Sequence, residues 1–195
     1  MFYQRLFQDA SFFELLQRID EDLAAEARSG GCSCGGVLHF ARFRRKPRGG
    51  PPGLVREVLV RQSLCCAREG CRRRSTPPSV LFLGRKVFFG VVVLLLPILR
   101  EGLTAARFRR LEEALPVSRR TVLRWQRWWR EVVPATPCWQ RLRGVLSEPG
   151  RIAAVLPSGL VDAVAPAPEA SARVVAVLRL LAPLAASAGL GGWAG

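Results

Sequence analysis

The first periodic stretch of the chain alternates apolar and polar residues at helical spacing. Its apolar positions lie on one side of a helix drawn at about 100° per residue, and they are Phe12, Leu15, Leu16, Ile19 and Leu23. Ser11 followed by Glu14 is typical of a capping box at a helix start. The pattern therefore predicts an amphipathic helix over residues 11–27, in an N-terminal segment 1–30, with Asp20 and the acidic residues beside it facing water.

The next part of the chain has the composition of short strands and turns. Residues 37–43 and 55–64 mix valine, leucine and phenylalanine with polar residues, which predicts two strands. A basic loop rich in proline and glycine, residues 44–53, connects them, and residues 76–79 predict a turn. Residues 80–83 predict a third short strand.

Two apolar runs follow farther along the chain. Residues 87–99 predict a buried core helix, because this run is shorter than the roughly 20 residues that span a bilayer. The second run, 174–194, is interrupted by Arg179, Pro183 and several glycines, so we expect a helix over 171–181 and a glycine-rich tail rather than a membrane anchor. Residues 164–170 alternate alanine with proline and predict a semi-rigid linker.

Between these runs, the pattern has the order of a helix-turn-helix. Thr104 and Ser118 are the predicted N-caps of helices over 104–115 and 119–133, with a turn at residues 116–117. The apolar face of the second helix consists of Val122, Trp125, Trp128, Trp129, Val132 and Val133. Arginines dominate its opposite face, which suits the DNA major groove. The alternative is an ordinary surface helix whose arginines are solvated.

The distribution of charge narrows the choice of partner. The chain of 195 residues has a formal net charge of +15. Residues 31–86 carry +11 and residues 98–145 carry +7, whereas residues 1–30 carry −3 and residues 146–195 are neutral. Two basic blocks between acidic and neutral ends indicate a polyanion partner, and we expect DNA.

Cysteines add candidate metal chemistry. Cys32 and Cys34 form one short pair, Cys66 and Cys71 form a second, and glycines flank the first pair. Four thiolates from two such turns can hold one tetrahedral Zn²⁺ ion. Three disulfides are the alternative for six cysteines, but a cytoplasmic chain, which we expect here, favours metal.

Three further residues could enter such a site. Cys65 adjoins Cys66, and either could be the third ligand; we prefer Cys66 because it makes the tighter loop with Cys71. Cys138 stands alone, and we expect a buried thiol. His39, the only histidine, is expected to be a structural strand residue rather than a ligand.

The order of turn, strand, loop, strand and turn is that of a zinc ribbon. The sequence therefore predicts an α+β fold with a small zinc-ribbon-like domain (31–84), a helix-turn-helix domain (85–145), flanking helices and an apolar C-terminal segment with a linker (146–195). The expected DNA contacts come from the loop, from the run after Cys71 and from the second helix. The residues are Arg44, Arg45, Lys46, Arg48, Arg72, Arg73, Arg74, Arg119, Arg120, Thr121, Arg124 and Arg127.

Residues 30–135 also carry a resemblance to a known family. The stretches Cys-Ser-Cys-Gly-Gly (32–36), Cys-Cys-Ala-Arg-Glu-Gly-Cys-Arg-Arg-Arg (65–74) and Ser-Arg-Arg-Thr-Val-Leu-Arg-Trp (118–125) resemble the N-terminal part of bacterial transposase-like proteins. Those proteins join a zinc ribbon to a helix-turn-helix. The resemblance implies zinc on the four cysteines, DNA contact by the helix that begins at Ser118, and a bacterial, nucleoid-associated protein.

Catalysis has little support in the sequence. After position 113 the acidic residues are only Glu131, Glu148, Asp162 and Glu169, and no β-rich stretch presents them together as a transposase triad. A single histidine also argues against nucleophilic or acid–base catalysis. The other interpretation is a non-catalytic subunit or an interaction adaptor, in which the ribbon is structural and the C-terminal segment binds a protein partner or a second copy.

Overall fold

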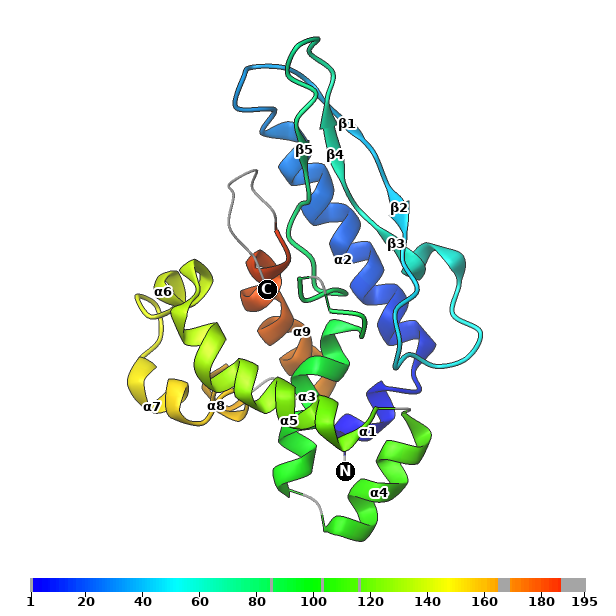
Figure 1. The fold of residues 1–195 in the computed structure, drawn as a ribbon, viewed down its shortest axis with the longest axis vertical. Helices are drawn as coiled ribbons and strands as arrows, with labels where there is room; N and C mark the ends of the chain where they lie inside the picture. Colours follow the sequence, from blue (N-terminus) through cyan, green and yellow to red (C-terminus); the bar gives the residue numbers. More distant parts are fainter. Residues whose placement is uncertain (1, 85, 103, 116, 165–168, 187–195) are drawn as a thin grey trace.

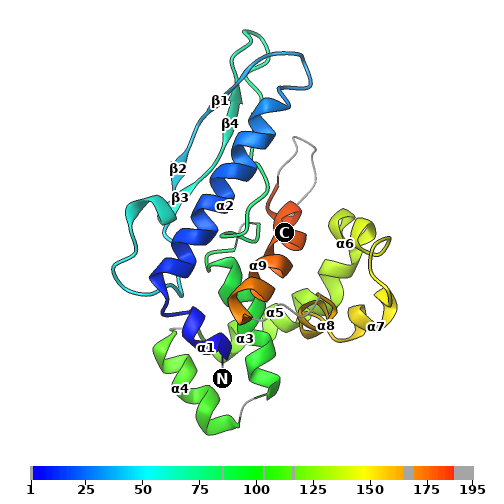
Figure 2. The same cartoon turned by 180° about the vertical axis from the view of Figure 1, so that it is seen from behind.

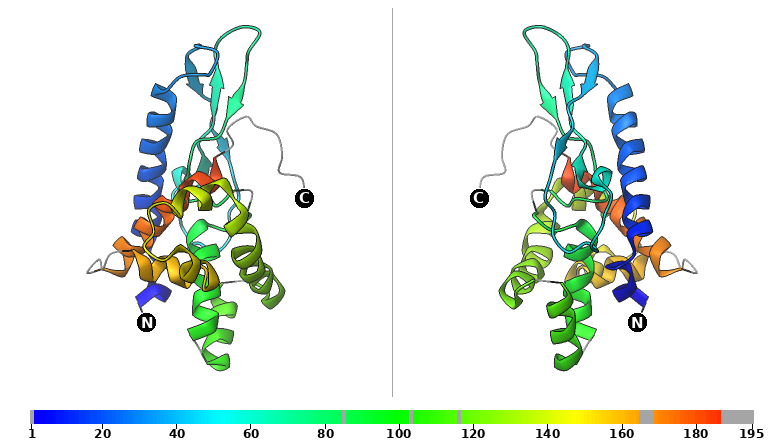
Figure 3. Two further views of the ribbon diagram at one scale, coloured as in Figure 1. Left: turned by 90° about the vertical axis from the view of Figure 1, so that its left-hand side faces the viewer. Right: turned by 90° about the vertical axis from the view of Figure 1, so that its right-hand side faces the viewer.

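The computed structural model describes residues 2–84, 86–102, 104–115, 117–164 and 169–186. The long helix α2 and narrow antiparallel sheets lie side by side in the upper part of the molecule, and the other helices gather below them (Figures 1 and 2). Seen from the side, α2 and the strands form two layers (Figure 3). The fold is mixed α+β and mostly helical, which confirms the coarse fold class.

The bounds of the elements follow the chain order. The helices are α1 (Phe2–Leu6), α2 (Ala10–Ser29), α3 (Gly90–Gly102), α4 (Ala105–Ala114), α5 (Arg119–Arg127), α6 (Pro137–Leu142), α7 (Pro149–Ala154), α8 (Ser158–Ala163) and α9 (Ala170–Leu181). Shorter helical turns are η1 (Arg56–Leu59), η2 (Trp128–Val132), η3 (Val133–Ala135) and η4 (Ala182–Ala185). The strands are β1 (Leu38–Phe40), β2 (Phe43–Arg44), β3 (Val60–Arg61), β4 (Leu64–Cys66) and β5 (Arg74–Ser75).

The amphipathic helix near the N-terminus is present, but its cap differs from the prediction. The capping box at Ser11 is wrong: Asp9 is the N-cap, and its side chain accepts a hydrogen bond from the Phe12 amide at 3.2 Å. The expected exposure of Asp20 is also wrong, since this side chain is only 1% exposed. Its carboxylate accepts hydrogen bonds from the backbone amides of Val80 and Leu81. Helix α2 is thereby tied to the segment before α3.

The strands are shorter than predicted. The first predicted strand is divided into β1 and β2, and the second is interrupted by η1, which turns Val58 into the core with no exposed area. A strand at 80–83 is wrong, because the amides of Val80 and Leu81 donate to Asp20 and that of Phe82 donates to Ser79, not to a neighbouring strand. The sheets have the orders β1-β4-β5 and β2-β3.

The apolar run at 87–99 forms the centre of the core, as predicted. Helix α3 has six consecutive residues, 91–96, with no exposed area. Helix α5 packs against α3, and the indole Nε1 of Trp129 donates a hydrogen bond to the Val93 carbonyl at 3.0 Å. The second apolar run also contributes to this core, since Val174, Val177 and Leu178 of α9 are fully buried in it.

No helix within the described ranges is both long and apolar enough to cross a membrane. The predicted linker at 164–170 and the glycine-rich tail fall mostly or wholly outside the described residues, as does position 116 of the predicted turn. Helices α6, α7 and α8 were not predicted; each is six residues long, too short to show a clear helical repeat.

Candidate metal centre and arginine surfaces

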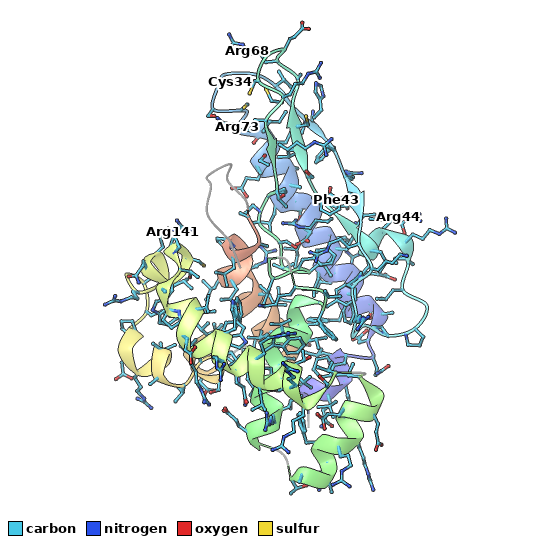
Figure 4. All side chains as sticks on the ribbon, viewed as in Figure 1. Cys34, Phe43, Arg44, Arg68, Arg73 and Arg141 are labelled. Carbon is cyan, nitrogen blue, oxygen red and sulfur yellow. The ribbon has the colours of Figure 1, made fainter. Side chains whose placement is uncertain are left out.

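Four cysteine side chains meet at the upper tip of the molecule. The Sγ atoms of Cys32, Cys34, Cys66 and Cys71 all lie within 4.8 Å of one another. Cys32 and Cys34 come from the loop between α2 and β1, Cys66 ends β4, and Cys71 precedes β5. Figure 4 labels Cys34 in this cluster, above the end of α2. Residues 39 positions apart in sequence are thus brought within reach of one ion.

The spacing of the sulfur atoms matches a tetrahedral thiolate site. Sγ of Cys32 lies 3.8 Å from that of Cys71, and Sγ of Cys34 lies 3.5 Å from that of Cys66. Four sulfurs at the usual Zn–S distance of about 2.3 Å are separated by about 3.8 Å. The two sulfur atoms of a disulfide lie about 2.05 Å apart, and all six cysteines are free thiols. The residues present therefore fit Zn²⁺ and do not form the three disulfides considered as the alternative.

Glycines allow the first turn to close. Gly31 and Gly35 adopt left-handed backbone angles, with φ of 69° and 78°. The Cys32 amide donates to the Gly36 carbonyl at 3.0 Å, which closes the loop. A Cβ at Gly36 would lie 2.7 Å from the sulfur of Cys66, so only glycine leaves room for that thiol.

The thiols of the cluster differ in pKa. The Gly36 amide lowers the pKa of the Cys34 thiol to about 6, whereas burial raises the pKa of the Cys66 thiol to about 12. Four thiolates at this spacing repel one another unless a cation lies between them. A soft divalent ion such as Zn²⁺ compensates that repulsion.

The neighbouring cysteines and the histidine lie outside the cluster. The thiol of Cys65 points to the carbonyls of Cys66 and Arg72, at 3.7 and 3.8 Å. His39 pairs with Cys65 across β1 and β4 and is exposed. Cys138 is buried, as expected, and its thiol faces the Leu180 carbonyl.

Arginines surround the metal centre. Arg68 donates to the Cys34 carbonyl at 2.6 Å, and Arg73 donates to the Ser33 hydroxyl at 2.7 Å. Figure 4 labels Arg68 and Arg73 beside Cys34. Arg72, Arg73 and Arg74 are all exposed. Folding of the cysteine loops thus fixes the position of a basic tip.

The basic loop contributes unevenly to the surface. Arg44, Lys46 and Arg48 are exposed. Arg45 instead folds back, donating to the carbonyls of Gly84 and Lys86 at 3.2 and 2.7 Å. Its guanidinium therefore fastens the loop to the segment before α3, and burial lowers its pKa.

Helix α5 has the two faces that the sequence indicates. Its start is capped by Ser118, whose side chain accepts from the Thr121 amide at 3.3 Å. Val122, Trp125, Trp129 and Val133 are buried, whereas Val132 of the predicted apolar face is 36% exposed. The helix continues through η2, so the turn at the tryptophans is π-helical.

The arginines of this helix differ in their partners. Among the residues that the structure describes, Arg119, Arg120 and Arg124 are exposed and form no ion pair. Nε of Arg127 lies 3.9 Å from Oε1 of Glu131, so these two side chains form an ion pair. The hydroxyl of Thr121 is already hydrogen-bonded to Ser118 at 3.0 Å. The three unpaired arginines are thus the groups that a polyanion would meet first.

The two basic surfaces do not adjoin. The cysteine cluster lies at the top of the molecule, while α5 crosses its lower half (Figures 1 and 3). The cysteine cluster and the arginine face of α5 are therefore separate surfaces. The length of α2, 20 residues, separates the sheet tip from the helical part.

One group of surface residues was missed by the sequence reasoning. Phe40 and Phe43 are exposed beside Arg42, Arg44 of β2 and Arg28 near the end of α2. The alternation Phe-Ala-Arg-Phe-Arg at 40–44 was the signal available in the sequence.

Comparisons with protein-family models, with curated proteins and with solved structures found no match to this chain.

Proposed function

We propose that this chain is a zinc-stabilised DNA-binding protein related to transposase-like proteins. The four clustered cysteines hold one structural Zn²⁺ ion, and the exposed arginines of α5 contact the DNA duplex. The proposal concerns binding and includes no catalytic step.

The metal part of the proposal is supported by the donor set. Four thiols at tetrahedral spacing make a closed site, with no coordination position left for a substrate. Bound zinc supplies folding energy there, because the sheets of two or three short strands bury few apolar residues. Within the described ranges of the chain, the buried cluster at this tip consists of Leu38, Leu64 and Cys66.

The DNA part rests on one observation, the unpaired arginine face of α5. Arg119, Arg120 and Arg124 project from a helix whose other face is anchored by Trp125 and Trp129. Guanidinium groups match phosphate and guanine edges in geometry. A rigid anchored helix presents them without the cost of ordering a loop.

The salt dependence of binding tests this assignment. We expect the double variant Arg120→Ala, Arg124→Ala to bind a DNA duplex about tenfold more weakly at moderate salt. The slope of log affinity against log salt should fall in magnitude by about 1.8, because two phosphate contacts are lost. Fluorescence anisotropy of a labelled duplex measures both quantities.

A matched variant separates this effect from general charge. Arg141→Ala with Arg143→Ala removes the same two charges from exposed positions at α6, away from α5 (Figure 4). It should leave the affinity within a factor of two or three. Equal losses in both double variants would contradict a recognition role for α5.

The adaptor interpretation has less support in the part of the chain that the structure describes. It needs an apolar C-terminal surface; Val155 is 51% exposed there, but the apolar side chains of α9 at 174, 177, 178 and 181 have no exposed area. They fill the core of the same chain.

A further inference from the structure

An aromatic and basic strip follows β1 and β2, away from α5. Phe40 is 36% exposed and Phe43 is 48% exposed, a large apolar area for a surface. Arg42 and Arg44 are exposed beside them, and Arg28 approaches from the end of α2. Figure 4 shows Phe43 and Arg44 on the side of the sheet, with Arg44 projecting from the body.

The two phenylalanine rings differ in what covers them. The guanidinium carbons of Arg28 and Arg42 lie 5.2 and 4.6 Å from the centre of the Phe40 ring. Nε of Arg42 also donates to Oε1 of Gln62 at 2.9 Å. Phe40 is therefore a support that holds two arginines in place, since cation–π contact fixes them over the ring.

The ring of Phe43 is the one left for a ligand. Within the described part of the chain it stacks on no aromatic ring and carries no cation over its face. It lines a groove of about 280 Å³ between α2 and the β2-β3 pair. That volume is at the small end of ligand sites, so it suits a single planar ring better than a larger molecule.

The groove offers polar groups suited to the edge of such a ring. Gln17 and Glu21 of α2 lie on one side, with Glu57 of η1 among the other lining residues. Carboxylates repel phosphate but accept hydrogen bonds from ring and exocyclic N–H groups. Arg42 and Arg44 line the same groove and supply the charge that phosphates need.

We infer that this groove binds an unpaired nucleobase of a single-stranded nucleic acid, with the base stacked on Phe43. Arg42 and Arg44 hold the flanking phosphates, while the glutamates and Gln17 meet the base edge. Bases in a duplex are stacked on their neighbours, so only an unpaired base can present its face to Phe43. The inference rests on the proposed nucleic-acid binding, but it concerns a different surface and a different strand state.

The test uses the full zinc-loaded chain and a labelled single strand of about 12 nucleotides. Phe43→Ala should weaken binding of this strand about tenfold, whereas Phe43→Trp should retain it. Neither variant should change binding of an abasic strand of equal length, which has phosphates but no bases. Val55→Ala, at a residue 44% exposed near the same loop, is the matched control and should bind normally.

Three results would overturn the inference. The first is an unchanged affinity of Phe43→Ala for the base-bearing strand, and the second is an equal loss for the abasic strand. The third is that a lysine-rich peptide binds at Phe43 and the single strand cannot displace it. Duplex binding separates this from the proposed function, because the Arg120 and Arg124 double variant should lose duplex affinity while Phe43→Ala keeps it.

Discussion

Replacing Asp20 by asparagine should change how the stability of this protein depends on pH. The carboxyl group is 1% exposed, and burial raises its pKa to about 6 from an ordinary value of 3.8. Hydrogen bonds from Ser79, Val80 and Leu81 and the charge of Arg61 oppose that rise without cancelling it. Asparagine keeps one acceptor oxygen in the same place but does not titrate in this range.

The sign and size follow from proton linkage. A folded-state pKa above the unfolded value means that the native chain binds the proton more tightly, so stability rises as pH falls through about 6. The stabilisation that protonation of Asp20 provides is fully present below about pH 3.8 and absent above about pH 7. The full pKa shift of Asp20 adds about 3 kcal/mol to the free energy of unfolding, of which about 1.3 kcal/mol is gained between pH 7 and pH 5.

Urea unfolding at pH 7 and pH 5 measures this contribution. The unfolding free energy of the wild type, minus that of Asp20→Asn, should grow by about 1.3 kcal/mol on acidification. Comparing the two proteins cancels any loss of metal that both share. Asp22→Asn, at an exposed residue of the same helix, controls for removal of one carboxylate. A difference that shrinks on acidification would refute the reasoning, because it would show that the Asp20 carboxylate is held charged.

Three further variants test the packing and the metal centre. Gly36→Ala should lower zinc affinity about tenfold in a chelator competition, because its Cβ would meet the Cys66 sulfur at 2.7 Å. Gly35→Ala is the control: its Cβ would meet nothing within 4 Å, so it shows the effect of a left-handed backbone position alone. Trp129→Phe should destabilise the fold by about 2–4 kcal/mol in urea, since it loses volume and the hydrogen bond to Val93; a change below about 1 kcal/mol would contradict the packing described. Ser118→Ala should cost about 1 kcal/mol through loss of the cap, and no change in thermal unfolding would mean that the cap is not needed.

The sequence predicts the elements whose pattern is local. The burial of α3 follows from its unbroken apolar run, and the two faces of α5 follow from helical periodicity. The cysteine cluster is predictable in the same way, since each pair lies within one short turn and glycines stand where the backbone needs left-handed angles.

Other features depend on contacts that no local pattern contains. Asp20 looks like a surface residue within α2, but the amides of a segment 60 residues away bury it. Arg45 looks like part of a phosphate loop, but two carbonyls near α3 bind its guanidinium. Separation of the cysteine tip from α5 is likewise set by the length of α2 and by its packing.

The metal content of the purified chain tests the central claim most directly. Under reducing conditions, we expect about one zinc per chain in the wild type and in Cys65→Ser, and far less in Cys66→Ser. This pair of variants differs by one position, yet only Cys66 has its sulfur within the cluster. Absence of zinc from the wild type, or its loss in Cys65→Ser with retention in Cys66→Ser, would contradict the zinc site on which the account is built.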